Sequence, residues 1–485
     1  MPLFDDIKTP WEDPKDLLSR NEYADSLTTM LDSRPGPYVM NLNAAWGAGK
    51  TFFLRHWAAS LQDTHKVVYI NAWESDFSDD PMLAVMSSIQ QQLISDLENK
   101  ELAKGLIAKG GRFLKAIAPT VLAGLTRKAI GSEAFEDATD LLKGISKDDA
   151  EIVSDMVSDA ASHVLADHQA KEQTIKDFKN ILTEAATQAL ETDDENVKVL
   201  VFVDELDRCR PSYAVELLES IKHLYSIKRM AFVVATDTDQ LQHAICAIYG
   251  AGFHGERYLR RFFDTSFTLP DPKYWEYVKY LVSFLPPDSL NIHWRYFKPP
   301  SVQGANAPTD GELTKTNNLA RILAFMAEAC ALDLRSMNQV WRRGEAILLI
   351  NQKYQADAVW LFALLTLQVA SNNHFESLVS AIQRHEGLDG SKVYHQKSIT
   401  MLWQSPFEDR SPNQFLTFSE IITGYVEGLR RALASPDDWN SVTKDPVNLT
   451  SAVHADAMQN KSIGTRAELP LVSHLDAVLF AGHIQ

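Results

Sequence analysis

The stretch Ala44-Ala45-Trp46-Gly47-Ala48-Gly49-Lys50-Thr51 decides the fold. It follows the apolar run Tyr38-Val39-Met40-Asn41-Leu42 and precedes the helix-like stretch Phe52–Trp57. A strand, then a Gly-rich loop, then a helix is the context that a phosphate-binding loop requires. Small residues let backbone N–H groups close around phosphate oxygens, and the start of the helix adds partial positive charge. The sequence therefore predicts an α/β fold with a parallel sheet around a P-loop.

Within this stretch the residue types match separate tasks in phosphate binding. We expect Lys50 to reach the β- and γ-phosphates of a nucleotide and the Thr51 hydroxyl to bind Mg²⁺. The residues predicted to contact the nucleotide are Trp46, Gly47, Ala48, Gly49, Lys50, Thr51 and Phe52. The pattern has Gly where this chain has Ala44, and because Ala disfavours positive φ the first turn of the loop is expected to differ. The alternative is a chance Gly-Lys-Thr in an ordinary loop.

An acidic segment follows a second predicted strand. The β-branched apolar run Val199–Val203 is typical of a strand buried on both faces, and it ends in Asp204-Glu205-Leu206-Asp207-Arg208. Ligands bind at the carboxyl ends of strands in open α/β sheets. We therefore predict that Asp204 holds Mg²⁺ and that Glu205 polarises the attacking water; the alternative for Asp204 is a helix cap. Asp207 either caps the next helix, which is the favoured interpretation, or assists or replaces Glu205.

Later polar residues complete the candidate site. Thr236 and Asp237 follow the buried run Met230–Ala235, beside the expected γ-phosphate, where they either contact it or cap a turn. Arg260 and Arg261 are candidates for an arginine finger on the nucleotide of the same or a neighbouring subunit. Surface salt bridges are the alternative for both arginines.

The composition is that of a globular protein in a reducing compartment. Of the 485 residues 45% are hydrophobic and 23% are charged, and the three cysteines, Cys209, Cys246 and Cys330, are too far apart for a disulfide framework or a metal signature. The first 20 residues are polar and acidic, and no window holds about 18 uninterrupted apolar residues, so we predict a cytoplasmic protein without a signal peptide or membrane span. The net charge of −17 disfavours broad nucleic-acid binding.

The pattern of the chain predicts five segments. They are a first part of the nucleotide-binding core at 1–100, a helical insertion at 101–196, a second part of the core at 197–298, a helical lid at 311–370 and an α-rich region of unknown role at 371–485. Arg335 opens a helix of the predicted lid, where it either reaches the nucleotide or has a structural role.

The insertion is divided by charge. Residues 101–130 carry six basic residues and one acidic residue, whereas residues 131–196 carry 17 acidic and five basic residues. Apolar residues at helical spacing, such as Ile152 and Met156, predict a helical hairpin or bundle. The apolar run 116–125 is too short to span a bilayer. A helix packed on the core or on a partner is favoured over a cationic segment that lies on a membrane surface.

Four phrases together resemble the KAP NTPases, a branch of the P-loop NTPases close to the AAA+ and STAND groups. They are Trp46-Gly47-Ala48-Gly49-Lys50-Thr51, Asn71-Ala72-Trp73-Glu74, Val203-Asp204-Glu205-Leu206-Asp207-Arg208-Cys209 and Tyr258-Leu259-Arg260-Arg261-Phe262. The resemblance runs from about residue 15 to 345. Many members carry transmembrane helices between the two nucleotide motifs, whereas residues 101–130 are too charged to span. Members commonly read Asp-Asp-Leu-Asp-Arg, and Glu205 in place of the second Asp strengthens its assignment as a general base.

The resemblance implies an Mg²⁺-dependent NTPase, with ATP as the expected nucleotide, that acts as a switch or motor in a multiprotein assembly. Several bacterial members take part in defence against phages, which makes that role plausible. Because an arginine from a neighbouring subunit gives on the order of 10³–10⁵ in rate, self-association or partner proteins are expected. The alternative is a nucleotide-gated adaptor with little turnover, or a scaffold on the membrane periphery, that recruits effectors.

Overall fold

The computed structural model describes residues 4–95, 198–284, 291–298, 314–386, 400–403, 414–434, 449–450, 453 and 471–481, with short gaps inside these ranges, and scattered positions between 176 and 190. The chain divides into two compact units, Met1–Pro270 and Asp271–Gln485. Each unit has hydrophobic core of its own. The predicted insertion at 101–196, with its helical hairpin and its basic segment, lies outside the described residues except at those scattered positions.

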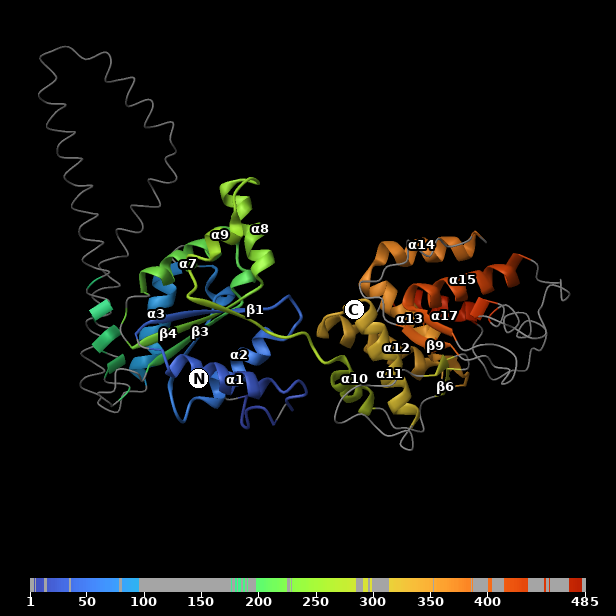
Figure 1. Cartoon of the computed structure of the whole chain (residues 1–485), viewed down its shortest axis with the longest axis horizontal. Coiled ribbons are helices and arrows are strands. Elements are labelled where there is room, and N and C mark those ends of the chain that lie inside the picture. The colour runs from blue at the N-terminus through green and yellow to red at the C-terminus, as the bar shows by residue number, and fades with distance from the viewer. Residues whose placement is uncertain are drawn as a thin grey trace, which may run out of the picture. The chain divides into compact units, whose positions relative to one another are not determined.

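A five-stranded parallel sheet forms the centre of the first unit (Figure 1). Its strands lie in the order β2-β3-β4-β1-β5. They are β1 (Tyr38–Asn43), β2 (Lys66–Asn71), β3 (Val199–Asp204), β4 (Met230–Thr236) and β5 (Thr265–Thr268). The three apolar runs predicted from the sequence are thus confirmed as strands β1, β3 and β4, and β5 adds a short edge strand beside β1. Strands β3 and β4 are buried along their whole length because both faces of the sheet are covered.

Helices cover both faces of this sheet. Figure 1 shows α1 and α2 on one face and α3 and α7 on the other. The helices of this unit are α1 (Arg20–Asp32), α2 (Lys50–Ser60), α3 (Pro81–Ser95), α7 (Pro211–Leu224), α8 (Thr238–Tyr249) and α9 (Gly255–Leu259). Single helical turns at Trp73–Ser75 and Leu206–Arg208 follow β2 and β3.

The alternation along β3 shows which face each of its side chains meets. Leu200 and Phe202 belong to the core that includes Trp57 of α2, and the rings of Phe202 and Trp57 lie 5.1 Å apart. Val201 and Val203 belong to the core on the α7 side. Successive side chains of a strand point to opposite faces, so Asp204, two residues after Phe202, lies on the α2 face. The strand register pairs Asn71 with Asp204 and brings the ends of β2 and β3 together.

The second unit is mainly helical. Its helices are α10 (Tyr274–Ser283), α11 (Lys315–Ala329), α12 (Leu334–Ile350), α13 (Ala358–Ala370), α14 (Asn372–Gln383), α15 (Phe418–Ala434) and α17 (Leu471–Ala481). Short strands form two small sheets, β6 (Ile292–His293) with β8 (Ala356–Asp357), and β7 (Phe297–Lys298) with β9 (Thr400–Trp403) and β10 (Gln414–Thr417). Helix α13 is buried from Ala358 to Leu367, as its uniformly apolar sequence predicts.

The observed division of the chain differs from the predicted segments in two places. The boundary lies at Pro270–Asp271 instead of residue 298, because α10, β6 and β7 contribute side chains to the core of the second unit. The predicted segments 311–370 and 371–485 also share that core, since α13 packs against α14, α15 and α17. A period of 3.6 residues identifies a buried helix but does not reveal which other helices bury it.

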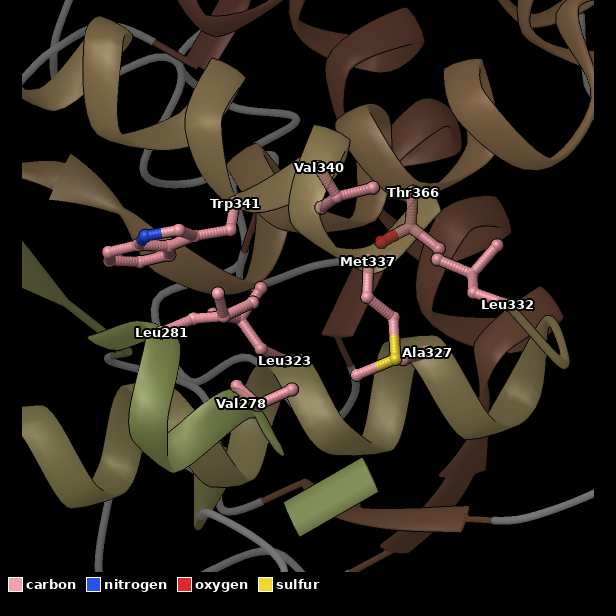
Figure 2. Close-up of a pocket in the computed structure, with 9 residues that line it drawn as sticks. All are labelled: Val278, Leu281, Leu323, Ala327, Leu332, Met337, Val340, Trp341 and Thr366. Atoms are coloured by element: carbon pink, nitrogen blue, oxygen red, sulfur yellow. The ribbon is translucent and has the colours of Figure 1, made fainter. Parts of the chain in front are cut away.

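The second unit contains a small cavity lined by apolar side chains of α10 to α13 (Figure 2). Its volume is about 10 Å³ for the centre of a water molecule, which is roughly the space that one water needs. The exception to the apolar lining is Thr366, whose hydroxyl points into the cavity and finds no hydrogen-bond partner among the described residues. In the described part of the chain, no helix combines the length and the hydropathy needed to cross a membrane.

Candidate nucleotide-binding site

The loop between β1 and α2 has its left-handed residues at glycines. Gly47 has φ of 79° and Gly49 has φ of 90°, values that favour glycine. Ala44 does not adopt a positive φ, and its N–H donates to the Thr236 carbonyl as a continuation of the strand ladder. The departure from Gly at position 44 therefore introduces no backbone strain.

Lys50 is the first residue of α2 and is buried against the loop it follows. Its Nζ lies 2.7 Å from the Ala44 carbonyl oxygen, 3.4 Å from the Ala45 carbonyl oxygen and 3.0 Å from Oδ2 of Asp207. The side chains of Lys50 and Asp207 are only 9% and 2% exposed, so water screens this ion pair little. Thr51 follows in the first turn of α2, where the helix dipole favours an anion.

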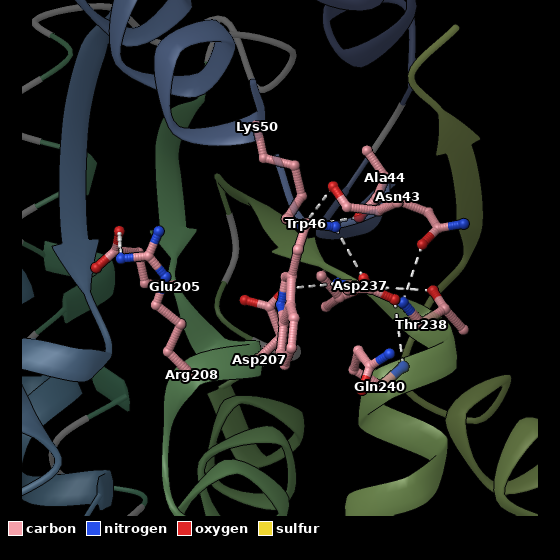
Figure 3. Close-up of polar contacts among 12 residues, drawn as sticks. Asn43, Ala44, Trp46, Lys50, Glu205, Asp207, Arg208, Asp237, Thr238 and Gln240 are labelled. Atoms are coloured by element: carbon pink, nitrogen blue, oxygen red, sulfur yellow. Dashed lines mark hydrogen bonds and ion pairs between the residues drawn. The ribbon is translucent and has the colours of Figure 1, made fainter. Parts of the chain in front are cut away.

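One oxygen of Asp207 collects three donors from two other parts of the site. Besides Lys50, Oδ2 accepts from Nε1 of Trp46 at 2.9 Å and from the backbone N–H of Asp237 at 3.0 Å (Figure 3). The prediction that Asp207 caps the next helix is wrong, because α7 begins only at Pro211 and Asp207 lies inside the helical turn Leu206–Arg208. That turn directs the carboxylate back toward the loop.

Both oxygens of Asp204 are hydrogen-bonded. Oδ1 accepts from the backbone N–H of Glu205 at 2.8 Å, and Oδ2 accepts from the Tyr69 hydroxyl at 2.7 Å. Asp204 is 1% exposed. Burial, with the neighbouring Asp204 carboxylate, raises the pKa of Tyr69, so the hydroxyl remains a donor. Tyr69 on β2 therefore fixes the orientation of the Asp204 carboxylate on the α2 face of the sheet.

Thr51 and Asp204 are the residues that would hold Mg²⁺. Both offer oxygen atoms, which are the ligands that Mg²⁺ prefers, and both belong to the α2 side of the sheet. Among the described residues no three His, Cys, Asp or Glu side chains gather into a metal-binding group. One carboxylate and one hydroxyl fit Mg²⁺ nevertheless, because this ion usually takes its remaining ligands from water and substrate phosphates.

Glu205 has an unusual backbone and a charged partner. Its φ is 60°, a value uncommon outside glycine, and it turns the chain from β3 into the helical turn that follows. Its Oε1 lies 2.7 Å from Nη1 of Arg208. Burial raises the pKa of Glu205, and the charge of Arg208 offsets part of that rise.

At the end of β4 the two polar residues have different contacts. The Thr236 hydroxyl is buried and donates to Oδ1 of Asn41 on β1 at 2.7 Å. Asp237 instead contacts the loop, since its Oδ2 accepts from the backbone N–H of Trp46 at 3.0 Å. Asp237 is also the N-cap of α8, where Oδ1 accepts from the Gln240 N–H at 3.2 Å. The capping interpretation of Asp237 is therefore confirmed, and the loop contact is additional.

With this geometry established, comparisons with known proteins identify the family. Residues 20–283, more than half of the chain, match the KAP family P-loop domain. The chain belongs to the KAP family. The resemblance that the four sequence phrases suggested is thereby confirmed.

A curated relative and two solved structures are also similar to this KAP chain. The phage T7 exclusion protein of Escherichia coli K12 is 23% identical over 266 residues, which cover 54% of this chain and 34% of that protein. The Aeropyrum pernix ORC2 protein has 11% identity over 96% of this chain and 95% of its own, with a TM-score of 0.32. Caenorhabditis elegans PCH-2 has 11% identity over 73% and 69%, with a TM-score of 0.29.

The three candidate arginines of the KAP chain, Arg260, Arg261 and Arg335, are exposed. Arg260 and Arg261 follow α9, and Arg260 pairs with Glu256 at 2.5 Å while its side chain stays 75% exposed. Arg335 lies in the first turn of α12, in the second unit. Phe52, predicted to contact the nucleotide, packs its ring 4.1 Å from that of His56. Phe52 lies in the first turn of α2, and its contact with the nucleotide stays a prediction.

The roles of two residues at the site of this KAP domain were not predicted from the sequence. The site role of Tyr69 depends on the pairing of β2 with β3, which no local pattern reveals. Asn71 was noted only as part of a family phrase. Its Oδ1 accepts from the N–H groups of Trp73 and Glu74 and so caps the helical turn after β2. A polar residue at the end of an apolar strand is the signal that points to Asn71.

Proposed function

We propose that this KAP protein hydrolyses nucleoside triphosphates in the presence of Mg²⁺, with ATP as the substrate. The proposal rests on one arrangement: the α2 N-terminus with Lys50 and Thr51, and Asp204, share one face at the carboxyl ends of the parallel strands. This is where ligands bind in open α/β sheets. The family match supports the same class of reaction.

Each residue of the site would have a defined task. Lys50 and the N–H groups of Gly47 to Phe52 would hold the phosphates, and Thr51 and Asp204 would hold the metal. Glu205 would orient the attacking water and accept its proton, and a raised pKa makes it a better base near neutrality. When bound at Thr51 and Asp204, Mg²⁺ would neutralise negative charge that develops during phosphoryl transfer.

A second candidate function is a nucleotide-gated adaptor with little turnover. The observation in its favour is the 2.7 Å ion pair between Glu205 and Arg208, which engages the carboxylate of the proposed general base. An enzyme in this state would bind nucleotide and hydrolyse it slowly until a partner drew Arg208 away. Arg260 and Arg261 are exposed, so either could reach the nucleotide of a neighbouring subunit.

Similarity to a phage exclusion protein suggests a biological setting in defence against phages. The match covers 34% of that relative, so the setting is a proposal about the shared P-loop domain. Its test is plaque formation on cells that express wild type or Lys50→Ala. Protection that disappears in Lys50→Ala while protein levels stay equal supports the setting. Equal plaque counts with wild type and empty vector contradict it.

The enzymatic proposal is tested by phosphate release from ATP across a range of protein concentrations. We expect Glu205→Gln to bind ATP and lose turnover, and Lys50→Ala to lose both. A rate per molecule that rises with wild-type concentration supports self-association. Full turnover in Glu205→Gln would overturn the assignment of the base. ATP binding without turnover in wild type would leave the adaptor as the function.

A further inference from the structure

The ammonium group of Lys50 is surrounded by as many acceptors as it has protons. An ammonium carries three N–H donors. The carbonyl oxygens of Ala44 and Ala45 and Oδ2 of Asp207 lie within 2.7 to 3.4 Å of Nζ. A phosphate can therefore bind Lys50 only if one of these acceptors gives way.

The Ala45 carbonyl, at 3.4 Å the most distant of the three, also accepts from the N–H of Ala48. Asp207 is the one charged acceptor of the three, so its ion pair with Lys50 is the contact that an incoming phosphate would replace. After the lysine leaves, its Oδ2 still accepts from Nε1 of Trp46 and from the N–H of Asp237. These donors come from the loop and from the end of β4, so Asp207 stays in position beside the phosphate site (Figure 3). A phosphate that takes Lys50 then faces a second negative charge nearby, which opposes its binding.

We propose that Asp207 is the resting counter-ion of Lys50 and competes with the nucleotide phosphates for it. Trp46 and Asp237 hold Asp207 for this task. The inference deepens the proposed function and rests on it, because the competitor is the phosphate chain of the nucleotide. The competition lowers the affinity below what the loop alone provides and restores a neutral, closed loop when the nucleotide leaves.

The test is calorimetric titration of the full chain with ADP, which binds the loop without turnover. Asp207→Asn keeps an oxygen that accepts from Trp46 and Asp237 but removes the charge. We expect it to bind ADP on the order of tenfold more tightly, because an ion pair no longer has to be broken. The ADP-induced rise in melting temperature should grow as well, since the apo variant leaves Lys50 buried without a counter-ion.

Glu205→Gln is the matched control. It removes one negative charge from the same segment, but Glu205 pairs with Arg208 and not with Lys50. Its ADP affinity should stay within about twofold of wild type. An equal gain in both variants would mean a general charge effect and would overturn the inference. A purely structural Asp207 would leave the ADP affinity of Asp207→Asn unchanged, which also overturns it.

A measurement on wild type keeps the inference testable if Asp207→Asn does not fold. When Lys50 leaves, the indole N–H of Trp46 shares Oδ2 with one donor fewer, so its hydrogen bond should strengthen. We expect its proton resonance, assigned with Trp46→Phe, to move downfield on addition of ADP. If ADP binds but the resonance moves upfield or does not move, the competition is contradicted while the proposed function stands. Failure of wild type to bind ADP overturns the proposed function together with it.

Discussion

The hydroxyl of Tyr69 on β2 donates a 2.7 Å hydrogen bond to Oδ2 of Asp204 at the end of β3. The two residues are 135 positions apart in the sequence. In the strand register Tyr69 pairs with Phe202, so its side chain lies on the face that Asp204 shares. The proposed metal-binding carboxylate is thus oriented by a residue that does not itself hold the metal.

Replacing Tyr69 by Phe should weaken the dependence of nucleotide binding on Mg²⁺. Without the hydroxyl the buried Asp204 carboxylate loses one of two fixed hydrogen bonds and can rotate. Loss of such a supporting group typically costs about tenfold or more in metal affinity. Titration of Mg²⁺ into protein with a fluorescent ADP analogue measures this shift. Tyr23→Phe, at a tyrosine that packs on Phe267, is the control, and an unchanged Mg²⁺ midpoint in Tyr69→Phe would contradict the assignment.

Gly344 allows α12 to approach α13 closely. A Cβ added at Gly344 would lie 2.2 Å from Cε1 of Phe362, which is buried. Gly344→Ala should therefore destabilise the chain by about 1–3 kcal/mol in denaturant unfolding. Combining it with Phe362→Leu, which makes room, should cost less than the sum of the two single changes. The control is Gly252→Ala, where the added methyl meets nothing within 4 Å.

Thr366→Val should stabilise the second unit. The Thr366 hydroxyl is buried in the apolar cavity and has no hydrogen-bond partner in the described ranges. Valine has the same shape and removes the unsatisfied group, a gain of about 1 kcal/mol in the free energy of unfolding. The matched change is Thr423→Val, which should destabilise, because the Thr423 hydroxyl donates to the Ser419 carbonyl at 2.8 Å. A loss of stability in Thr366→Val would indicate a bound water in the cavity.

An acidic group on α15 should make stability depend on pH. Hydrogen bonds from Arg430 and Arg431 lower the pKa of Glu427 despite partial burial. A carboxyl with a lowered folded pKa stabilises the fold above its unfolded pKa, and this contribution is lost as pH falls through the folded value. Glu427→Gln should therefore lower the free energy of unfolding at pH 7 by less than about 1 kcal/mol, and the difference from wild type should be smaller at pH 3 than at pH 7. An equal difference at both pH values would contradict this, and exposed Glu376→Gln is the control.

The elements around the P-loop could be predicted because their signals are local. The buried runs at β1 and β3 and the Gly-Lys-Thr at the start of α2 are contiguous in the chain. The contacts of Asp207, which was wrongly predicted to cap the next helix, could not be predicted from a local signal. Its carboxylate contacts Trp46, 161 positions away, through a helical turn whose direction the sequence does not specify. The positive φ values fall at Gly47 and Gly49 and not at Ala44, in keeping with the preference of alanine for negative φ, and the expected difference of the first turn stays a prediction.

The sequence by itself determined the loop, the buried strands and the acidic residues at the end of β3, because glycine position, apolar period and residue type are properties of short segments. Only the tertiary structure decided which side chain each acidic residue contacts. Asp204 faces Tyr69 and the α2 side through the parity of β3, whereas Asp207 is turned toward Lys50. Strand pairing and burial bring these distant residues within hydrogen-bond distance, and there the low dielectric makes each pairing matter.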